Sequence, residues 1–532
     1  SSITRVSESL VNFVLSPRKS HFNPLEIAFP ETNVEHGVEN LFALESLGLK
    51  EDSELSSVDE KIIKKFEEDI QLIDGKYFVS LPWYEDKIAQ VPSNHNVALA
   101  VLNSVMKSLQ QRNLFDAYNA VFEQQLSSGI IERIAVNPSD YHKYVWVPHR
   151  PVVKTTPQAT TKVRPVFNCS LKTGNSPSLN EAAFKGPDLM TNLMQLLLSF
   201  RSRKFAAVAD IRQAFLMINL RNEEDMNRFC FFMYNATGEL ECYRYRTIVF
   251  GYTSSPFCLQ YILKFHASLY HRDSISDLLT NNLYVDNFLV TADSPEFLQE
   301  VYTESRRRLS EGGFDLRSWN TNEPKLAEKL IADDTMVNHG RPTEKVLGYD
   351  YYPSEDMITL SQVEPDNQAN TKRSILSETS KVFDPVGIYT PVTVKGRILI
   401  KKLWTDKLDW DVPIPSNYSD EWKDTSADLS KLHTLKFQRN AVSGDLNSMA
   451  IFCDASREAY GFAAYSICNN QSNLIFSKSK VSPIKRRSLP TLELLSVYLA
   501  MKCLDSILPS FKSESFSNIT IAVDAQIVLS WL

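Results

Sequence analysis

The sequence lacks the features of membrane and secreted proteins. No run of about 18 apolar residues occurs in its 532 residues, so no membrane-spanning helix is predicted. Its seven cysteines show no paired spacing, which favours a reducing intracellular compartment over a disulfide-stabilised scaffold. The first residues carry no signal-peptide pattern, and neither an internal repeat nor a low-complexity tract is present. These absences favour an intracellular globular protein.

A general excess of basic residues is also absent. The formal net charge is −7, which excludes a uniformly basic nucleic-acid coat. Residues 31–75 hold 13 acidic and 4 basic residues, a local net charge of −9, so the rest of the chain has a net charge of +2. Because nucleic acid can be held in one local groove, the total charge does not exclude nucleic-acid binding.

Length and apolar content predict several domains with sizeable cores. Domains typically run to about 100–200 residues, and 43% of this chain is hydrophobic. Apolar spacing predicts acidic helices over 38–73, a long helix over 97–128 and another over 295–311. β-Prone segments alternate with these helices, which predicts an α/β (α+β) core. Residues 411–419 are rich in proline and predict a hinge.

Two strand-like stretches end in aspartate and carry the main chemical signal. Residues 283–290 have apolar triplets on both sides of Asp286-Asn287, which predicts a β-hairpin with this pair at its tip. Residues 205–210 form an apolar strand that ends at Asp210. A surface turn explains the hairpin taken alone. Together, two strand-end carboxylates are suitable ligands for a hard divalent cation such as Mg²⁺.

Seven motifs follow one another along the chain, at residues 160–168, 209–215, 250–257, 284–287, 312–319, 345–348 and 383–387. Any one of them alone is a weak signal. As an ordered set, they resemble the polymerase of Pao/BEL-type long-terminal-repeat retrotransposons. The resemblance covers approximately residues 40–532.

This resemblance implies a reverse transcriptase with palm and fingers, a connection segment, and then an incomplete ribonuclease H-like domain. In the family a protease precedes the polymerase, but no Asp-Ser-Gly or Asp-Thr-Gly motif occurs here, so no protease is expected. The expected units are a lead-in linker at 1–37, an amino-terminal helical and fingers-associated region at 38–140, fingers and palm at 141–345, thumb and connection at 346–445, and the ribonuclease H-like domain at 446–532.

The resemblance implies RNA-directed DNA polymerase activity by two-metal nucleotidyl transfer. Asp210 and Asp286 would be the metal ligands, with the backbone carbonyl of Ile211 as a third contact. Lys162 and Arg164 would hold the nucleotide triphosphate, the arginine as a planar fork and the lysine as a point charge. An exposed strand face is the alternative explanation for these two cations.

Three further residues would shape the nucleotide pocket. Phe215 is at the family's sugar-gate position, where its ring would exclude a ribose 2′-hydroxyl, although a core phenylalanine is the alternative. Gly251 would allow close approach of the backbone. Phe250 stands where several retroviral relatives carry glutamine, and we expect it to pack there.

Two positions depart from the family pattern. The family has Asp-Asp after Tyr-Val, whereas this chain has Asp286-Asn287, and an amide carries no charge for a metal. Ser318 stands where the family commonly has lysine, although Arg317 is adjacent. An active polymerase and a catalytically impaired nucleic-acid-binding remnant are therefore both open, and an unrelated α/β enzyme with coincidental motifs is a third reading.

A second acidic set lies near the carboxyl end. Asp454 and Asp524 follow strand-like segments and Glu493 lies on an amphipathic helical pattern, the order found in ribonuclease H folds. By resemblance these three carboxylates would be catalytic metal ligands, and the basic loop 480–487 before the helix is placed for phosphate contacts or is a solvated charge run. Because the family fold continues with a further strand, helices and a fourth acidic ligand, we expect an incomplete domain and a poor nuclease.

The resemblance also implies the cofactors, partners and location. The expected cofactor is Mg²⁺, two ions per site, with Mn²⁺ as an alternative. The expected partners are RNA or DNA template–primer, deoxynucleoside triphosphates, and other parts of a polyprotein such as a protease and an integrase; no membrane is expected. The expected location is intracellular, in a cytoplasmic element particle, with the nucleus as an alternative.

Overall fold

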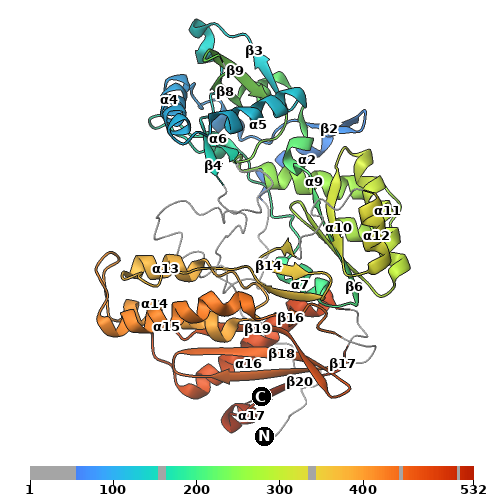
Figure 1. Cartoon of the computed structure of the whole chain (residues 1–532), viewed down its shortest axis with the longest axis vertical. Coiled ribbons are helices and arrows are strands. Elements are labelled where there is room, and N and C mark those ends of the chain that lie inside the picture. The colour runs from blue at the N-terminus through green and yellow to red at the C-terminus, as the bar shows by residue number, and fades with distance from the viewer. Residues whose placement is uncertain are drawn as a thin grey trace.

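The structure is a computed structural model in which secondary structure forms an upper and a lower part (Figure 1). The described residues are 56–153, 163–235, 237–333, 343–442, 447–511 and 516–531. Most of the chain up to residue 333 forms the upper part, and the later residues form the lower part. Within the described segments, no helix is both long and apolar enough to cross a membrane. The predicted helices before residue 56 lie outside the described residues.

The top of the molecule is formed by helices that pack on two small antiparallel sheets. Helices α4 (His95–Gln111) and α5 (Phe115–Ser127) contact the strands β3 (Ile131–Ile134), β4 (His149–Val153), β5 (Val163–Phe167), β8 (Cys230–Tyr234) and β9 (Leu240–Tyr245). The single helix predicted over 97–128 is wrong, because the chain breaks between α4 and α5. Asn113 has a φ of 52°, a left-handed conformation that asparagine tolerates and that ends a helix.

The palm is a four-stranded antiparallel sheet in the order β10-β11-β6-β12. Its strands are β10 (Leu283–Tyr284), β11 (Asn287–Ala292), β6 (Phe205–Ile211) and β12 (Leu316–Thr321). Helix α11 (Pro295–Glu311), confirmed with its predicted bounds, covers one face, where Trp319 packs edge-on against Phe288 and Tyr302. Ala209 pairs with Phe288, so both lie on the face that α11 covers. Because successive side chains of a strand alternate between faces, Asp210 points to the opposite face.

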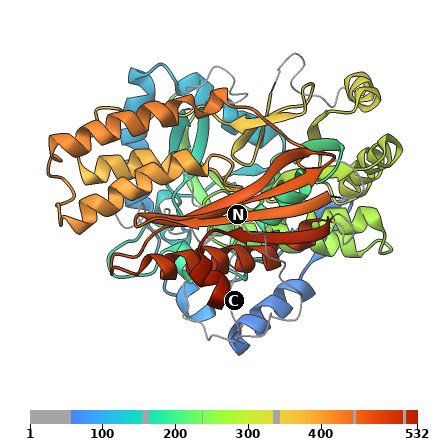
Figure 2. The ribbon, with the colours of Figure 1, turned by 90° about the horizontal axis from the view of Figure 1, so that it is seen from below.

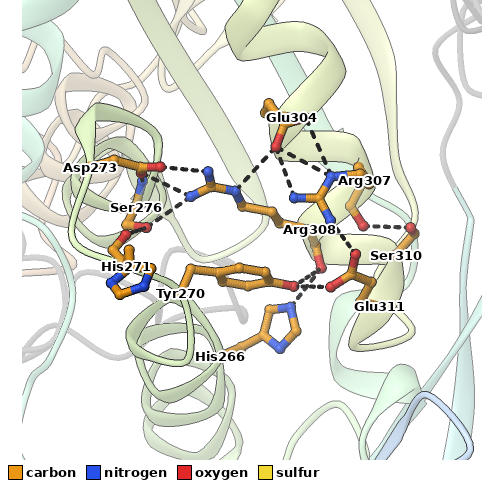
Figure 3. Close-up of polar contacts among 10 residues, drawn as sticks. All are labelled: His266, Tyr270, His271, Asp273, Ser276, Glu304, Arg307, Arg308, Ser310 and Glu311. Carbon is orange, nitrogen blue, oxygen red and sulfur yellow. Dashed lines mark hydrogen bonds and ion pairs between the residues drawn. The ribbon is translucent and has the colours of Figure 1, made fainter.

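Three helices beside the palm sheet are joined by an ion network (Figure 3). Arg308 of α11 donates to both carboxylate oxygens of Asp273 at 2.9 and 2.6 Å, at the start of α10 (Ser274–Asn281). Hydrogen bonding to Arg308 lowers the pKa of Asp273. His266 of α9 (Ser255–Ser268) donates to the Arg308 carbonyl at 2.6 Å, and Tyr270 donates to the same oxygen at 3.2 Å. The network fixes α9 and α10 against the helix that covers the palm.

The connection is a second antiparallel sheet with three helices. Its strands, in the order β13-β14-β15-β16, are β13 (Glu344–Val346), β14 (Tyr349–Tyr352), β15 (Met357–Leu360) and β16 (Phe437–Gln438). Its helices are α13 (Lys372–Ser380), α14 (Thr390–Thr405) and α15 (Ser416–Lys431). The hinge predicted over 411–419 is wrong, because Ile414 is buried, its N–H donates to Asn370 at 2.8 Å, and α15 begins at Ser416.

The last sheet is mixed, in the order β19-β18-β17-β20, with β17 and β20 parallel. Its strands are β17 (Asn447–Ala455), β18 (Ala459–Cys468), β19 (Gln471–Val481) and β20 (Phe516–Val523). Helix α16 (Leu489–Ile507) lies along one face of it (Figure 2). Burial alternates along the first half of β17 because one face packs on α16, which gives this sheet its own core.

The remaining helices and strands complete the upper and lower parts. They are α2 (Ser57–Glu68), β1 (Gln71–Ile73), β2 (Lys76–Val79), α3 (Glu85–Ile88), η3 (Pro138–Lys143), α6 (Leu179–Ala182), α7 (Leu193–Phe200), η4 (Ala214–Met217), β7 (Asn219–Leu220), α8 (Glu223–Asn227), α12 (Pro324–Ala332), η5 (Leu432–Thr434), η6 (Leu508–Ser510) and α17 (Gln526–Trp531).

Candidate active sites

Pairing between β6 and β11 brings the two predicted palm carboxylates together. Asn287, the first residue of β11, is the cross-strand partner of Asp210, the penultimate residue of β6. Asp286 immediately precedes Asn287, and its carbonyl accepts a hydrogen bond from the Ile211 N–H at 2.8 Å. Both aspartates are half-buried. Asp210 and Asp286 therefore share one end of the palm sheet.

The hairpin that carries Asp286 turns one residue earlier than the sequence predicts. Tyr284 pairs with Asn287, so Val285 and Asp286 form the two-residue turn and Asn287 belongs to the strand. Val285 has a φ of 58°, a conformation that β-branched residues rarely adopt and that costs about 1–3 kcal/mol. Its side chain is buried, and its carbonyl accepts from Gln260 of α9 at 3.3 Å. Packing against α9 thus holds the strained turn in place.

The environment of Asp286 opposes its negative charge. Burial, followed by the nearby Asp210 carboxylate, raises the pKa of Asp286 to about 6, and Arg164 opposes the shift. Asn287 Nδ2 donates to Asp286 Oδ1 at 2.9 Å. An aspartate at position 287 would carry a second negative charge there, whereas the amide holds Asp286 by a hydrogen bond and adds no charge.

Of the two cations predicted to hold the triphosphate, one lies among the described residues and the other does not. Arg164 is an exposed residue of β5, and it is close enough to Asp286 to influence its pKa. Lys162 lies outside the described residues. Arg164 is therefore the one of these two cations that the described residues place within electrostatic range of Asp286.

Two aromatic rings and a glycine lie at the predicted nucleotide pocket. Phe215 is 9% exposed in η4, and Phe250 is 48% exposed, with ring centroids 5.0 Å apart at 82°. Gly251 has a φ of 97°, and a Cβ there would lie 2.5 Å from the Phe167 carbonyl oxygen. Only glycine fits this approach without displacing the loop.

Sequence reasoning missed Asn180, which holds the loop around Gly251. Asn180 of α6 donates through Nδ2 to the Gly251 carbonyl at 2.9 Å and accepts from the Thr253 N–H at 2.9 Å. Ser178 and Glu181, on either side of Asn180 in the chain, form a capping box, an S-x-x-E pattern that is readable from sequence. That pattern predicts the helix, but nothing local predicts contacts with a loop some 70 residues away.

Strand β12 is irregular beside Asp210. Arg317 is the cross-strand partner of Asp210 on the side opposite Asn287, and the register then shifts before Asn320. Ser318, at the position where the family commonly has lysine, lies in this bulge with a φ of 54°. Arg317 lies on the same face of the palm sheet as Asp210, the face opposite α11. Among the described residues, its buried Nε has no hydrogen-bond partner. Arg317 is thus the cation that β12 supplies beside the palm site.

The second acidic set also comes together in space. Asp454 lies near the end of β17, Glu493 lies on α16, and Asp524 directly follows β20. Each offers a ligand oxygen within 4.8 Å of the others. Burial, followed by the charges of Asp454 and Asp524, raises the pKa of Glu493 to about 7.

This carboxylate cluster fits a divalent cation. The buried Oε2 of Glu493 has no hydrogen-bond partner among the described residues, and a buried oxygen without a partner is costly. All three candidate ligands are carboxylates, the donors that Mg²⁺ and Mn²⁺ prefer. Asp210 and Asp286 fit the same ions in the palm. They supply two carboxylates, one fewer than the carboxyl-terminal cluster, because Asn287 is neutral.

Comparison with solved structures identifies the fold as that of a reverse transcriptase. A foamy viral protease–reverse transcriptase with double-stranded DNA matches with a TM-score of 0.53 and 13% identity, over 95% of this chain and 92% of the other. A second such complex gives 0.52 and 12%, over 96% and 79%. The same enzyme type with an RNA/DNA hybrid gives 0.51 and 11%, over 92% of this chain and 63% of the other. At these identities the match shows the fold alone.

A match to a protein family lies in the carboxyl-terminal part of the chain. Residues 371–525 match the family described as the Pao retrotransposon-like RNaseH-like domain, so this region is similar to that family. The match begins at the start of α13 and ends after β20, and it includes Asp454, Glu493 and Asp524. The resemblance to Pao-type elements is thereby confirmed. Among curated proteins, no significant match is found.

Proposed function

We propose that this chain is an RNA-directed DNA polymerase of a Pao-like retrotransposon with an attached ribonuclease H-like nuclease. The observation that carries the proposal is the β6–β11 pairing, which brings Asp210 and Asp286 to one end of an antiparallel palm sheet. The foamy viral structures hold double-stranded DNA or an RNA/DNA hybrid, which supports the same substrate class here. The overall reverse transcriptase fold disfavours a coincidental match by an unrelated enzyme.

The proposed cofactor is Mg²⁺, with Mn²⁺ as an alternative, at two ions per site. When bound, these ions would lower the pKa of the attacking hydroxyl or water and neutralise charge on the phosphate. Asp210 and Asp286 would hold them in the palm, and Asp454, Glu493 and Asp524 in the nuclease-like domain.

The surrounding residues would position the nucleotide. Arg164 presents a planar fork to the triphosphate from the exposed face of β5. The Phe215 ring, packed edge-on against Phe250, would occupy the space that a ribose 2′-hydroxyl needs. Gly251 and Asn180 fix the loop beside these rings.

One observation favours a second candidate, a nucleic-acid-binding protein with impaired catalysis. The charge missing at Asn287 leaves the palm with two aspartates, and in a partly dehydrated site each lost carboxylate costs more than it would in water. Binding of template–primer depends on many phosphate contacts and would persist.

The decisive measurement is primer extension on a primed RNA template, with Mg²⁺ and with Mn²⁺. We expect feeble extension by the unaltered chain and at least a tenfold gain in Asn287→Asp, which corresponds to about 1.4 kcal/mol of transition-state stabilisation. Template–primer affinity, measured by fluorescence anisotropy, should be equal in both.

The matched control is Asp210→Asn in the Asn287→Asp background, which should abolish extension and leave binding intact. Equal extension by the unaltered chain and Asn287→Asp would show that position 287 is not a working ligand. If both bind but neither extends, the polymerase proposal fails and the binding protein remains, with Ser318 the next position to change.

A further inference from the structure

Two arginines that take part in neither site are buried where the palm meets the nuclease-like sheet. Arg201 follows α7 and precedes β6, and Arg439 follows β16. Arg201 is 2% exposed and Arg439 is 0% exposed. Removing a guanidinium from water is costly unless its donors are satisfied, so such residues mark an interface that is closed in the folded protein.

Arg201 ties the palm to strand β19. The register of β18 and β19 shifts so that Ile475 is an extra, bulged residue. Arg201 donates to the carbonyls of Leu474, at 2.8 Å, and of Ile475. It also donates to the carbonyls of Gln438 and Arg439, each at 3.3 Å. One side chain thus binds the nuclease-like sheet and the connection at once.

Arg439 makes the reciprocal contacts to the palm. It donates to the carbonyl of Phe200 and, at 2.8 Å each, to those of Arg203 and Lys204. Its charge is balanced by Asp356, which accepts two hydrogen bonds at 2.6 and 3.0 Å. The turn between α7 and β6 is therefore held by five carbonyl–guanidinium contacts with the connection, three from Arg439 and two from Arg201, and by the two contacts of Arg201 with β19.

A third contact joins the palm to the helix that carries Glu493. Gln195 of α7 donates through Nε2 to the Ser506 carbonyl near the end of α16, at 2.6 Å. Figure 1 shows α7 next to the lower part of the molecule, beside β16. Asp454 lies in the same sheet as β19, and Asp524 directly follows β20 of that sheet, so this sheet and the helix that carries Glu493 are both bound to the segment that leads into Asp210.

We propose that Arg201 and Arg439 are positioning residues that hold the nuclease carboxylates at one fixed distance from the palm carboxylates. With the two sites fixed, an RNA/DNA hybrid that reaches both is cut at a defined distance from the primer terminus. The cutting rests on the proposed function, whereas the fixed distance is a property of the fold and is measured without activity.

The distance is measured by pulsed electron paramagnetic resonance between two spin labels. Exposed Glu300 of α11 and Asp505 of α16 are changed to cysteine, and Cys468, the one cysteine that is not buried, is changed to serine. We expect one narrow distance distribution in this protein. Arg201→Lys keeps the charge but cannot reach the same four carbonyls, so the distribution should broaden at least twofold.

The matched control is Arg203→Lys, two residues away, whose side chain is partly exposed and 4.0 Å from Asp293. It should leave the distribution narrow. Circular dichroism establishes that each variant is folded, and if Arg201→Lys is not, Gln195→Met replaces it. A folded variant as narrow as the parent, or a parent already broad, would overturn the proposal.

The second readout is the length of RNA fragments from a 5′-labelled hybrid. We expect one dominant length for the parent and Arg203→Lys, and a spread of lengths for Arg201→Lys at an unchanged total cleavage rate. Loss of rate with the same length would indicate a merely structural role and contradict the proposal. If the parent cuts no RNA, the nuclease function fails while the distance measurement still decides the positioning role.

Discussion

At the scale of single residues, the charge around Asp286 determines what the palm can do. Its carboxylate is buried beside Asp210, receives a hydrogen bond from the Asn287 amide and is within the influence of Arg164. The nuclease-like site differs, because three carboxylates converge and one oxygen of Glu493 has no partner among the described residues. Loading with metal should therefore depend more steeply on pH at the nuclease-like site.

The pH dependence of metal binding at Glu493 is a direct prediction. A carboxyl whose pKa is raised to about 7 stays protonated in the folded protein below that pH, so it stabilises the fold there and this stability is lost as pH rises from about 4.5 to 7. A bound cation needs the ionised form. We expect Mn²⁺ to raise the melting temperature more at pH 8 than at pH 6.

The control for this prediction is Glu493→Gln, which keeps the shape of the side chain and removes its titration. Its melting temperature should respond weakly to Mn²⁺, and equally at both pH values. A response in the parent that is as large at pH 6 as at pH 8 would exclude Glu493 as the titrating ligand.

The sugar gate is a second prediction at this scale. Phe215→Ala should raise the incorporation of ribonucleotides relative to deoxyribonucleotides, because it removes the ring that would meet the 2′-hydroxyl. The measurement is single-nucleotide extension in the Asn287→Asp background, with Phe250→Ala as a neighbouring aromatic control. Unchanged sugar discrimination in a variant that still extends primers would assign Phe215 to the core.

At the scale of elements, the loop around Gly251 depends on a close backbone contact. A Cβ at this position would meet the Phe167 carbonyl at 2.5 Å, in a conformation that is already unfavourable for an L-residue. Gly251→Ala should therefore displace the loop, raise the KM for the nucleotide and destabilise the fold by about 1–3 kcal/mol. Steady-state extension and thermal melting measure the two effects.

The variant Gly238→Ala separates the strain of a positive φ from the clash with the Phe167 carbonyl. Gly238 also has a positive φ, 82°, but no atom lies within 4 Å of the position of its Cβ. It should lose stability without a change in KM. If Gly251→Ala behaves in the same way, the contact with Phe167 does not shape the nucleotide site.

Local pattern predicted many of the elements but not the contacts between distant ones. Helix α11 and the strand ending near Asp210 follow from apolar spacing. Asn113 splits the predicted helix over 97–128, because one left-handed residue overrides an apolar stripe. The position of the turn at Val285 was missed, since a positive φ at valine is held by packing against α9, which leaves no local signal.

The candidate sites were predictable as far as the ordered motifs reach. Asp210, Asp286 and the carboxyl-terminal acidic set meet as their order in the family implies. The residues that support these sites could not be predicted, because Asn180 contacts a loop some 70 residues away and Arg201 contacts a strand some 270 residues away. No periodicity records contacts over such separations.

At the scale of the whole molecule, the proposed nucleic-acid binding would have to come from local basic surface in an acidic chain. Residues 485–487, between β19 and α16, are three exposed cations, Lys485, Arg486 and Arg487, close in sequence to the helix that carries Glu493. Changing all three to serine should weaken RNA/DNA hybrid binding and reduce the slope of log K against log[salt] by about 2–3. Fluorescence anisotropy across a salt series measures this slope.

A triple change of exposed cations elsewhere provides the control. Lys61, Lys64 and Lys423 are exposed residues of α2 and α15, outside the loop that precedes α16, and their replacement should leave the slope unchanged. Equal effects of the two triple changes would indicate a response to net charge and no contact of the loop with phosphate.

The hydrogen bond from Asn287 to Asp286 has a consequence for the history of this gene. Because asparagine and aspartate have nearly the same shape, the backbone pairing of the hairpin and its pairing with Asp210 fit either residue, although an aspartate would replace the hydrogen bond to Asp286 with a second negative charge. Their codons differ by a single purine transition. One point mutation therefore separates the sequence from the family's Asp-Asp pair.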